Sequence, residues 1–222
     1  MKKPFHLTRT HWSSILVISV ILCSFVTPVL PGNASRTFDK VCLTLIFLSG
    51  VMSLDRKKWF VLVLSLSAFF LEWISGMLNL VYLSEISRAL NLFFFLLVVF
   101  YMVWQMAMAR IVSPRVILES IAGYLLLGLI FSTLVDAIML HDPAAYNITF
   151  PNQGAQPVNT SLSVPFYYGF ITMATVGYGD IVPLKPYARS LAMIIGISGQ
   201  LYIAIIIAML VGKFAGKQMD EK

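Results

Sequence analysis

The sequence has 222 residues, of which 59% are hydrophobic and 12% are charged, and its net charge is +6. Soluble domains carry about a quarter charged residues, so cytosolic enzymes and disordered proteins fit this composition poorly. The basic residues are scattered between apolar runs, a distribution typical of membrane topology signals and not of a nucleic-acid-binding face. The composition therefore predicts a membrane protein that does not bind nucleic acid.

The residue types that carry enzymatic chemistry form no recognisable pattern. Cys23 and Cys42 lie inside apolar stretches and are expected to be small buried side chains. The three histidines have no partners at metal-ligand spacing, and nucleophile and phosphate-binding motifs are missing. We therefore expect no catalytic residue, no enzymatic activity and no cofactor.

Apolar runs long enough to cross a bilayer recur along the chain. A helix needs about 20 apolar residues to cross about 30 Å of hydrocarbon. The runs predict six transmembrane helices, at residues 12–30, 38–54, 59–83, 89–109, 121–140 and 187–212. The second has an apolar core of only residues 41–54 and gains its length if residues 38–40 begin the helix.

The distribution of Lys and Arg predicts the orientation of these helices. With the N-terminus in the cytoplasm, eleven basic residues lie inside and five outside. Both termini are therefore expected on the cytoplasmic side of the plasma membrane, or of the inner membrane in a bacterium. The alternative, a signal peptide in place of the first span, lacks a clear cleavage site and leaves the other orientations unchanged.

A long segment, residues 141–186, separates the last two spans. Its first part, residues 141–162, is rich in Pro, Asn, Gln and Gly and predicts an exposed turret. Ser163 as N-cap and Pro165 in the first turn then predict a short apolar helix through Ala174. That helix is too short to cross a membrane but long enough to reach halfway.

The string TVGYGD follows this helix at residues 175–180. Residues 172–180 resemble the end of the pore helix and the selectivity filter of potassium channels, which carry TVGYG. The resemblance implies an all-α membrane protein of six transmembrane helices with a re-entrant pore helix and filter between the fifth and sixth. It also implies a homotetramer, because each chain supplies one of four filter strands, with K⁺ as the passively transported species.

Backbone oxygens are the groups that such a filter needs. A cation that leaves water must replace its oxygen ligands, and carbonyl groups can do so only if the chain turns them toward one axis. Gly177 and Gly179 can take the positive φ values that other residues avoid, while Val176 and Tyr178 brace the wall. The hydroxyl of Thr175 adds an oxygen at the inner end, so residues 175–179 are the predicted K⁺ sites.

The same resemblance assigns roles around the filter. Asp180 is expected to form an acidic ring at the outer mouth. Tyr167 and Tyr168 stand where the family often has two tryptophans, and with Thr172 they are expected to support the filter. Ile171 stands where some bacterial relatives carry a glutamate, so no carboxylate from that position is expected to pair with Asp180.

The sixth predicted span contains the candidate gate. Gly199 stands where the family commonly has a hinge glycine, and close helix packing is the alternative. Ile203, Ile207 and Val211 recur at i, i+4 and i+8 and are expected to line the inner pore as an apolar constriction. An ordinary packing stripe is the alternative for these three residues.

The fourth predicted span lacks the charges of a voltage sensor. Residues 89–109 contain no Lys or Arg, so we expect little or no voltage gating. We divide the chain into a voltage-sensor-like peripheral domain, residues 1–110, and a pore domain, residues 111–222. Ser113 and Pro114 predict a short interfacial helix that ends near Glu119.

Glu72 lies in the middle of the third predicted span, where an ionised carboxylate is costly. It is a candidate proton sensor, and a structural polar contact is the alternative.

Three other functions remain open for this sequence. A transporter subunit with four pore-loop repeats is disfavoured by the single filter copy. A non-conducting regulatory subunit and a weakly selective cation channel are the other two, and the complete GYGD string disfavours the last. Membrane lipid is the expected partner in every case.

Overall fold

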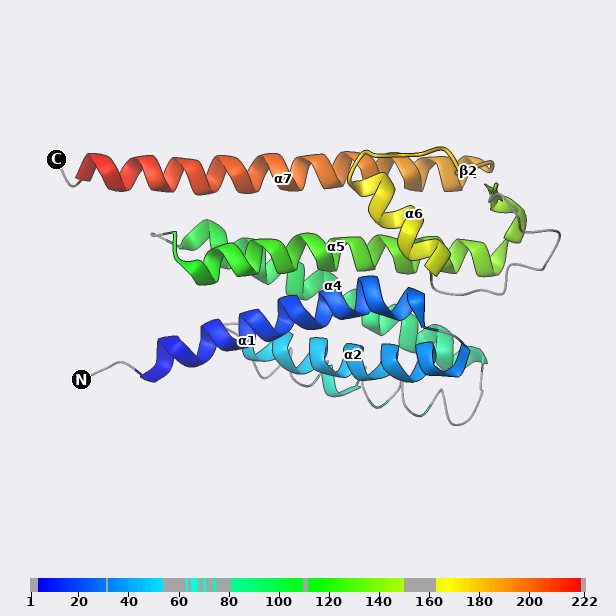
Figure 1. Cartoon of the computed structure of the whole chain (residues 1–222), viewed down its shortest axis with the longest axis horizontal. Coiled ribbons are helices and arrows are strands. Elements are labelled where there is room, and N and C mark those ends of the chain that lie inside the picture. The colour runs from blue at the N-terminus through cyan, green and yellow to red at the C-terminus, as the bar shows by residue number, and fades with distance from the viewer. Residues whose placement is uncertain are drawn as a thin grey trace.

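The computed structural model describes residues 4–30, 32–53, 63, 65–67, 70, 74, 81–109, 112–149 and 163–220. Most of these residues are helical, and the long helices lie roughly parallel or antiparallel to one another along the longest axis of the molecule (Figure 1). The start of α1 (Pro4–Ile21) and the end of α7 (Pro186–Asp220) lie at the same end of this array. A membrane protein built from long apolar helices is the architecture that the composition predicts.

The first two predicted spans are helical, with different bounds. α1 continues through a π-helical turn, η1 (Leu22–Val26), and a 3₁₀ turn, η2 (Thr27–Val29), where Pro28 interrupts the regular hydrogen bonds. α2 (Gly32–Ser53) begins six residues before the predicted start at residue 38 (38 − 32 = 6). The polar break between these spans is therefore shorter than expected, because small polar residues suit a first helical turn.

Described residues of the third predicted span, residues 63, 65–67, 70 and 74, are helical. Val63, Leu66, Phe70 and Ile74 are exposed, and their spacing places them on one face of a helix.

Two predicted boundaries are wrong. α4 (Val81–Met108) includes residues 84–88, which were expected to be a polar break, because Glu85 and Arg88 pair along the helix at 3.6 Å. α5 (Pro114–His141) is one continuous helix, so the expected separate interfacial helix is its first part. Ser113 does cap it, since its side chain accepts a hydrogen bond from the Val116 N–H.

Three helices among the described residues are long and apolar enough to cross a membrane. They cover Glu85–Met108, Pro114–His141 and Pro186–Lys213, and shorter apolar helices cover His11–Val26 and Lys40–Ser53.

A shared core joins α1, α2 and α4 to α5. Leu16, Phe94 and Leu126 are fully buried in this core, and Phe47 packs edge to face on Phe94 with ring centroids 4.8 Å apart. Inside a bilayer such contacts stabilise mainly through van der Waals packing, since lipid is as apolar as the side chains. The peripheral helices thus pack directly on the first helix of the predicted pore domain.

A short helix, α6 (Ser163–Met173), crosses between α5 and α7 (Figure 1). It lies close to α5 because two glycines leave room. A Cβ on Gly128 would come within 2.3 Å of the Phe170 ring, and one on Gly169 within 2.6 Å of the Ser132 hydroxyl. Pro165 lies in the first turn of α6, as the sequence predicts.

Two short strands add to the helical fold that the sequence predicts. β1 (Tyr146–Ile148) pairs antiparallel with β2 (Ile181–Pro183), with Asn147 opposite Val182. A 3₁₀ turn, η3 (Pro143–Ala145), leads into β1. Ala145 and Tyr146 are buried, so this part of the expected turret is packed against the molecule and not exposed.

Candidate functional site

The segment after α6 has an alternating backbone conformation. Thr175, Gly177 and Gly179 have φ values of 59°, 50° and 81°. The intervening Val176 and Tyr178 do not have positive φ. Such alternation lets a short strand turn its successive carbonyl groups to one side, which a regular strand does not do.

Hydrogen bonds to the end of α6 fix the first half of this segment. The N–H groups of Val176 and Gly177 both donate to the Ile171 carbonyl, at 3.0 and 3.4 Å. Because N–H and C=O point in opposite directions across a trans peptide, the carbonyls of Thr175 and Val176 point away from α6. Two of the residues expected to bind a cation therefore direct their carbonyl oxygens away from α6, on an exposed part of the chain.

Gly177 and Gly179 are required by backbone conformation and not by lack of space. A Cβ built on Gly177 or Gly179 would meet nothing within 4 Å, yet their φ values fall where side chains are disfavoured. Val176 and Tyr178 are 49% and 72% exposed in the single chain. Both side chains therefore lie on the surface of the single chain.

Contacts of Asp180 hold the C-terminal end of the segment. The Tyr167 hydroxyl donates to one Asp180 carboxylate oxygen at 2.6 Å, and the Ile181 N–H donates to the other at 3.1 Å. The Thr149 N–H also donates to the Asp180 carbonyl at 2.8 Å. Ile171 offers no carboxylate to pair with Asp180, as expected from the sequence. The partner of Asp180 on α6 is instead Tyr167.

Tyr168 and Thr172, the other two residues expected to support the filter, lie on α6. Tyr168 is buried and is hydrogen-bonded to Thr172, one helical turn further along α6. Its ring packs edge to face on Tyr146 of β1, with centroids 5.1 Å apart. Sequence reasoning missed Tyr146 and Thr149, although the alternation of apolar and polar residues from Tyr146 to Ile148 is a weak strand signal.

Near Thr175, where the segment begins, α7 touches the last turn of α6. A Cβ on Gly199 would lie 2.3 Å from the Met173 carbonyl oxygen, so the glycine permits backbone contact between the two helices. The next residue, Gln200, donates to the Thr175 hydroxyl at 3.5 Å. Sequence reasoning missed Gln200, although it interrupts an apolar stretch of α7.

The three residues expected to line the inner pore share an exposed face of α7. Ile203, Ile207 and Val211 are 37%, 55% and 62% exposed in the single chain. α7 is continuous through Gly199, so the structure gives this glycine a packing role, while its role as a hinge stays a prediction. Glu72 lies outside the described residues, and the role predicted for it stays a prediction as well.

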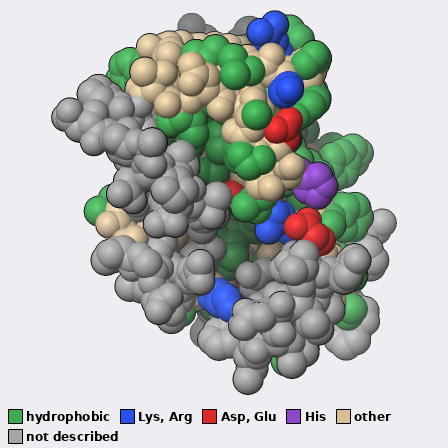
Figure 2. All heavy atoms as spheres, turned by 90° about the vertical axis from the view of Figure 1, so that its right-hand side faces the viewer, with side chains coloured by type: hydrophobic (Ala, Val, Ile, Leu, Met, Phe, Trp, Pro, Cys, Tyr) green, Lys and Arg blue, Asp and Glu red, His purple; other side chains and the backbone are tan. Residues whose placement is uncertain are grey.

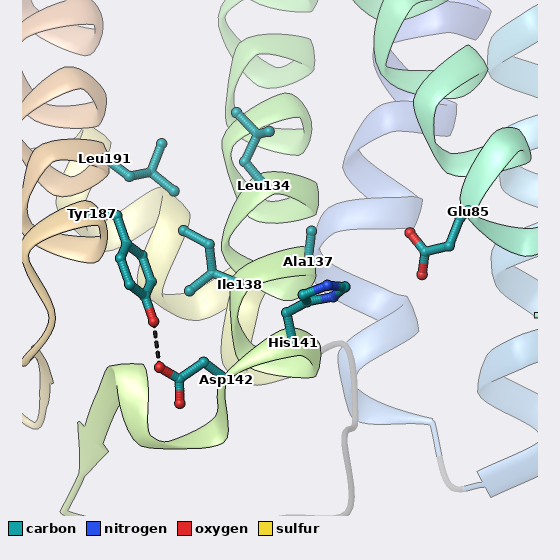
Figure 3. Close-up of a pocket in the computed structure, with 8 residues that line it drawn as sticks. All are labelled: Glu85, Leu134, Ala137, Ile138, His141, Asp142, Tyr187 and Leu191. Carbon is teal, nitrogen blue, oxygen red and sulfur yellow. Dashed lines mark hydrogen bonds between the residues drawn. The ribbon is translucent and has the colours of Figure 1, made fainter. Parts of the chain in front are cut away.

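A cavity of about 600 Å³ lies beside the start of α7, and residues 175–179 are not among those that line it. Figure 2 looks onto this end of the molecule, where charged side chains and a histidine gather among hydrophobic ones. Glu85, His141 and Asp142 line the cavity together with apolar residues of α5 and α7. Figure 3 shows the Tyr187 hydroxyl directed at Asp142, to which it donates a hydrogen bond that ties the start of α7 to the end of α5.

At this end of the molecule, hydrogen bonds and a nearby cation act on the carboxylate of Asp142. The Tyr187 hydroxyl and the Ala144 N–H both donate to its carboxylate, and Lys185 is near. These donors stabilise the ionised form and lower the pKa of Asp142 below its ordinary value.

Comparison with known proteins points to one family. Residues 122–215 match a family model described as an ion channel. A mouse protein, potassium voltage-gated channel subfamily A member 5, is 32% identical over 88 residues, which are 40% of this chain and 14% of the relative. The voltage-gated potassium channel Kch of Escherichia coli is 41% identical over 56 residues, 25% of this chain and 13% of the relative. The matched stretches thus span about one seventh of these relatives.

Proposed function

We infer that this chain, whose residues 122–215 belong to the pore-loop potassium channel family, conducts K⁺ passively across a membrane. The family consists of ion channels and not of enzymes. The observation that carries the proposal is the backbone of residues 175–179, with positive φ at Thr175, Gly177 and Gly179. Carbonyls of Thr175 and Val176 that point away from α6 are suited to replace the water shell of K⁺.

A homotetramer completes the proposed pore. One chain supplies one wall of oxygens, and a closed cage needs four such walls around an axis. The apolar window of α7 is 17% buried within the single chain, compared with 50% for α5. In the proposed tetramer, other copies of the chain cover α7 and the side chains of Val176 and Tyr178. This covering explains why both surfaces are exposed in the single chain.

Within each subunit we propose six spans in two parts, a peripheral domain of residues 1–110 and a pore domain of residues 111–222. α6 is the re-entrant pore helix, and its C-terminal carbonyls favour a cation through the helix dipole. Ile203, Ile207 and Val211 line the inner pore and Asp180 the outer mouth. The start of α1 and the end of α7 at one end of the molecule support two termini on one side, which we propose is the cytoplasm.

Voltage has little influence in the proposed mechanism, although the relatives named above are voltage-gated channels. The one basic residue of α4, Arg88, lies near its outer end and pairs with Glu85. Moving a charge through the field contributes about 2.3 kcal/mol per 100 mV, and α4 has no such charge at membrane depth.

Flux through the purified full chain tests the proposal. Reconstituted in proteoliposomes, it is expected to pass K⁺ in preference to Na⁺ and to be blocked by Ba²⁺. Gly177→Ala should abolish flux while the tetramer persists in cross-linking, because a side chain strains the positive φ at this site. Gly50→Ala in α2, whose Cβ would meet its nearest neighbour at an ordinary 3.6 Å, is the matched control and should conduct.

Other outcomes identify the alternatives. Equal Na⁺ and K⁺ flux would indicate a weakly selective cation channel. A wild-type protein that forms a tetramer but passes neither ion would indicate a non-conducting regulatory subunit. K⁺-selective flux through Gly177→Ala would refute the filter assignment.

A further inference from the structure

Gln200 is a polar residue in an otherwise apolar part of α7. Between Gly199 and Gly212 the polar side chains are those of Gln200 and Tyr202. The Tyr202 hydroxyl donates to the Ser120 carbonyl of α5 at 2.9 Å, so this tyrosine is turned away from the exposed face. Gln200 is exposed and lies three residues before Ile203, on the face that we propose lines the pore.

The position of Gln200 follows from the contact between α6 and α7. Gly199 brings the backbone of α7 against the Met173 carbonyl, at the point where α6 gives way to the filter. The neighbouring Gln200 is thereby carried to the inner end of the filter. Its side-chain amide donates to the Thr175 hydroxyl oxygen at 3.5 Å.

The hydrogen bonds of the Thr175 hydroxyl leave one site for a cation. A hydroxyl has one donor and two acceptor lone pairs. The donor goes to the Ala174 carbonyl at 2.7 Å, and one lone pair accepts from Gln200. One lone pair remains, and the two bonds fix its direction.

We propose that Gln200 is a positioning residue for the innermost K⁺ site, because it orients the Thr175 hydroxyl so that a lone pair faces the ion. This inference rests on the proposed function and adds a residue outside the filter segment to it. Without Gln200 the Thr175 hydroxyl would rotate between its neighbours and water. Binding of an ion from the inner side would then cost the conformational entropy of ordering this hydroxyl. Orientation by Gln200 removes that cost before the ion arrives.

Block by Ba²⁺ measures this site, because Ba²⁺ is close to K⁺ in size and carries twice the charge. Gln200→Met keeps the length of the side chain and removes the donor. The expected result is a three- to tenfold rise in the half-blocking Ba²⁺ concentration, about the effect of one lost hydrogen bond. Leu201→Met, which places the same side chain on an adjacent exposed position, should leave block unchanged.

A double-mutant cycle with Thr175→Val tests the route of the effect. If Gln200 acts through the hydroxyl, Gln200→Met has no further effect on Ba²⁺ affinity once the hydroxyl is gone. The Ba²⁺-induced rise in Tm of the purified tetramer gives the same cycle without requiring flux. An unchanged affinity in Gln200→Met, or a full effect that persists without the hydroxyl, overturns the proposal.

The two proposals fail in distinguishable ways. A wild-type protein that passes no K⁺ removes the proposed function. A wild-type protein that passes K⁺ and is blocked by Ba²⁺, with Gln200→Met blocked equally, removes only the role of Gln200.

Discussion

Single side chains near Asp180 hold the proposed filter by contacts between separate parts of the chain. Tyr167 lies 13 residues before Asp180 in the sequence, yet its hydroxyl oxygen lies 2.6 Å from a carboxylate oxygen of Asp180. A hydrogen bond to a charged group contributes about 1.5–3 kcal/mol. We therefore expect the proposed filter to depend on this phenol more than on the neutral contacts nearby.

Replacing Tyr167 tests that dependence. Tyr167→Phe should reduce sustained K⁺ flux roughly tenfold, the effect of about 1.4 kcal/mol lost from the conducting filter. The measurement is flux over time in proteoliposomes. Tyr146→Phe is the matched control, because within the described residues the buried Tyr146 hydroxyl has no hydrogen-bond partner, and this variant should conduct as well as the wild type.

The bond between Tyr187 and Asp142 predicts an acid-dependent stability. The folded pKa of Asp142 is lowered, so its contribution to stability is present above the unfolded value of about 3.9 and is lost as the pH falls through the folded value. The Tm of the wild type should exceed that of Asp142→Asn at pH 7. The difference should begin to shrink as the pH falls below about 4 and disappear once the pH is below the folded pKa, and a difference that stays constant with pH would contradict the assignment.

At the scale of elements, glycines decide how closely α6 and α7 approach. Gly199 leaves room for the Met173 carbonyl at 2.3 Å from its absent Cβ, whereas the corresponding distance from Gly196 to Thr172 is 3.9 Å. A side chain is therefore tolerated at one position and not at the other. This contrast separates a packing role from the hinge role that the sequence also allows.

Alanine at these two positions distinguishes the roles. Gly199→Ala should destabilise the folded protein by about 1–3 kcal/mol, because α7 must move away from α6. Gly196→Ala should leave the Tm unchanged or slightly higher, since alanine favours a helix. Thermal unfolding in detergent measures both, and an unchanged Tm in Gly199→Ala with altered gating would favour the hinge.

At the scale of the whole molecule, a buried polar network joins the peripheral helices to the pore. Arg115 and Glu119 of α5 pair at 2.7 Å, with side chains 14% and 3% exposed. Arg115 also donates to the Ser53 carbonyl of α2 at 2.8 Å and to Gln105 of α4 at 3.1 Å. Ser13 of α1 donates to Glu119 at 3.4 Å, so four helices meet at this pair.

Breaking this pair should destabilise the folded subunit. Arg115→Met leaves a buried carboxylate uncompensated, which costs about 3–5 kcal/mol, and adding Glu119→Gln should recover much of the loss. The matched control is Arg88→Met, whose partner Glu85 is 53% exposed, and it should cost less than about 1 kcal/mol. Tm values of the four proteins check this, and equal losses in both single variants would contradict it.

How much of the site the sequence predicts depends on the separation of the interacting groups. The positive φ of Gly177 and Gly179 and the short helix before them follow from neighbouring residues, so local reasoning reaches them. The boundaries of α4 and α5 were wrong because polar residues extend a helix past its apolar core. The β1–β2 pairing joins residues far apart in the chain, where a three-residue strand has almost no signal of its own.

The amino-acid order alone determines that this is a membrane protein with a TVGYGD segment, because composition and a local motif are properties of adjacent residues. Only the tertiary structure decides that Tyr167 holds Asp180, that Gly199 brings Gln200 to Thr175, and that Arg115 joins four helices. These contacts depend on how separate helices pack in three dimensions. Helix packing is a sum over many weak contacts, which no single stretch of sequence contains.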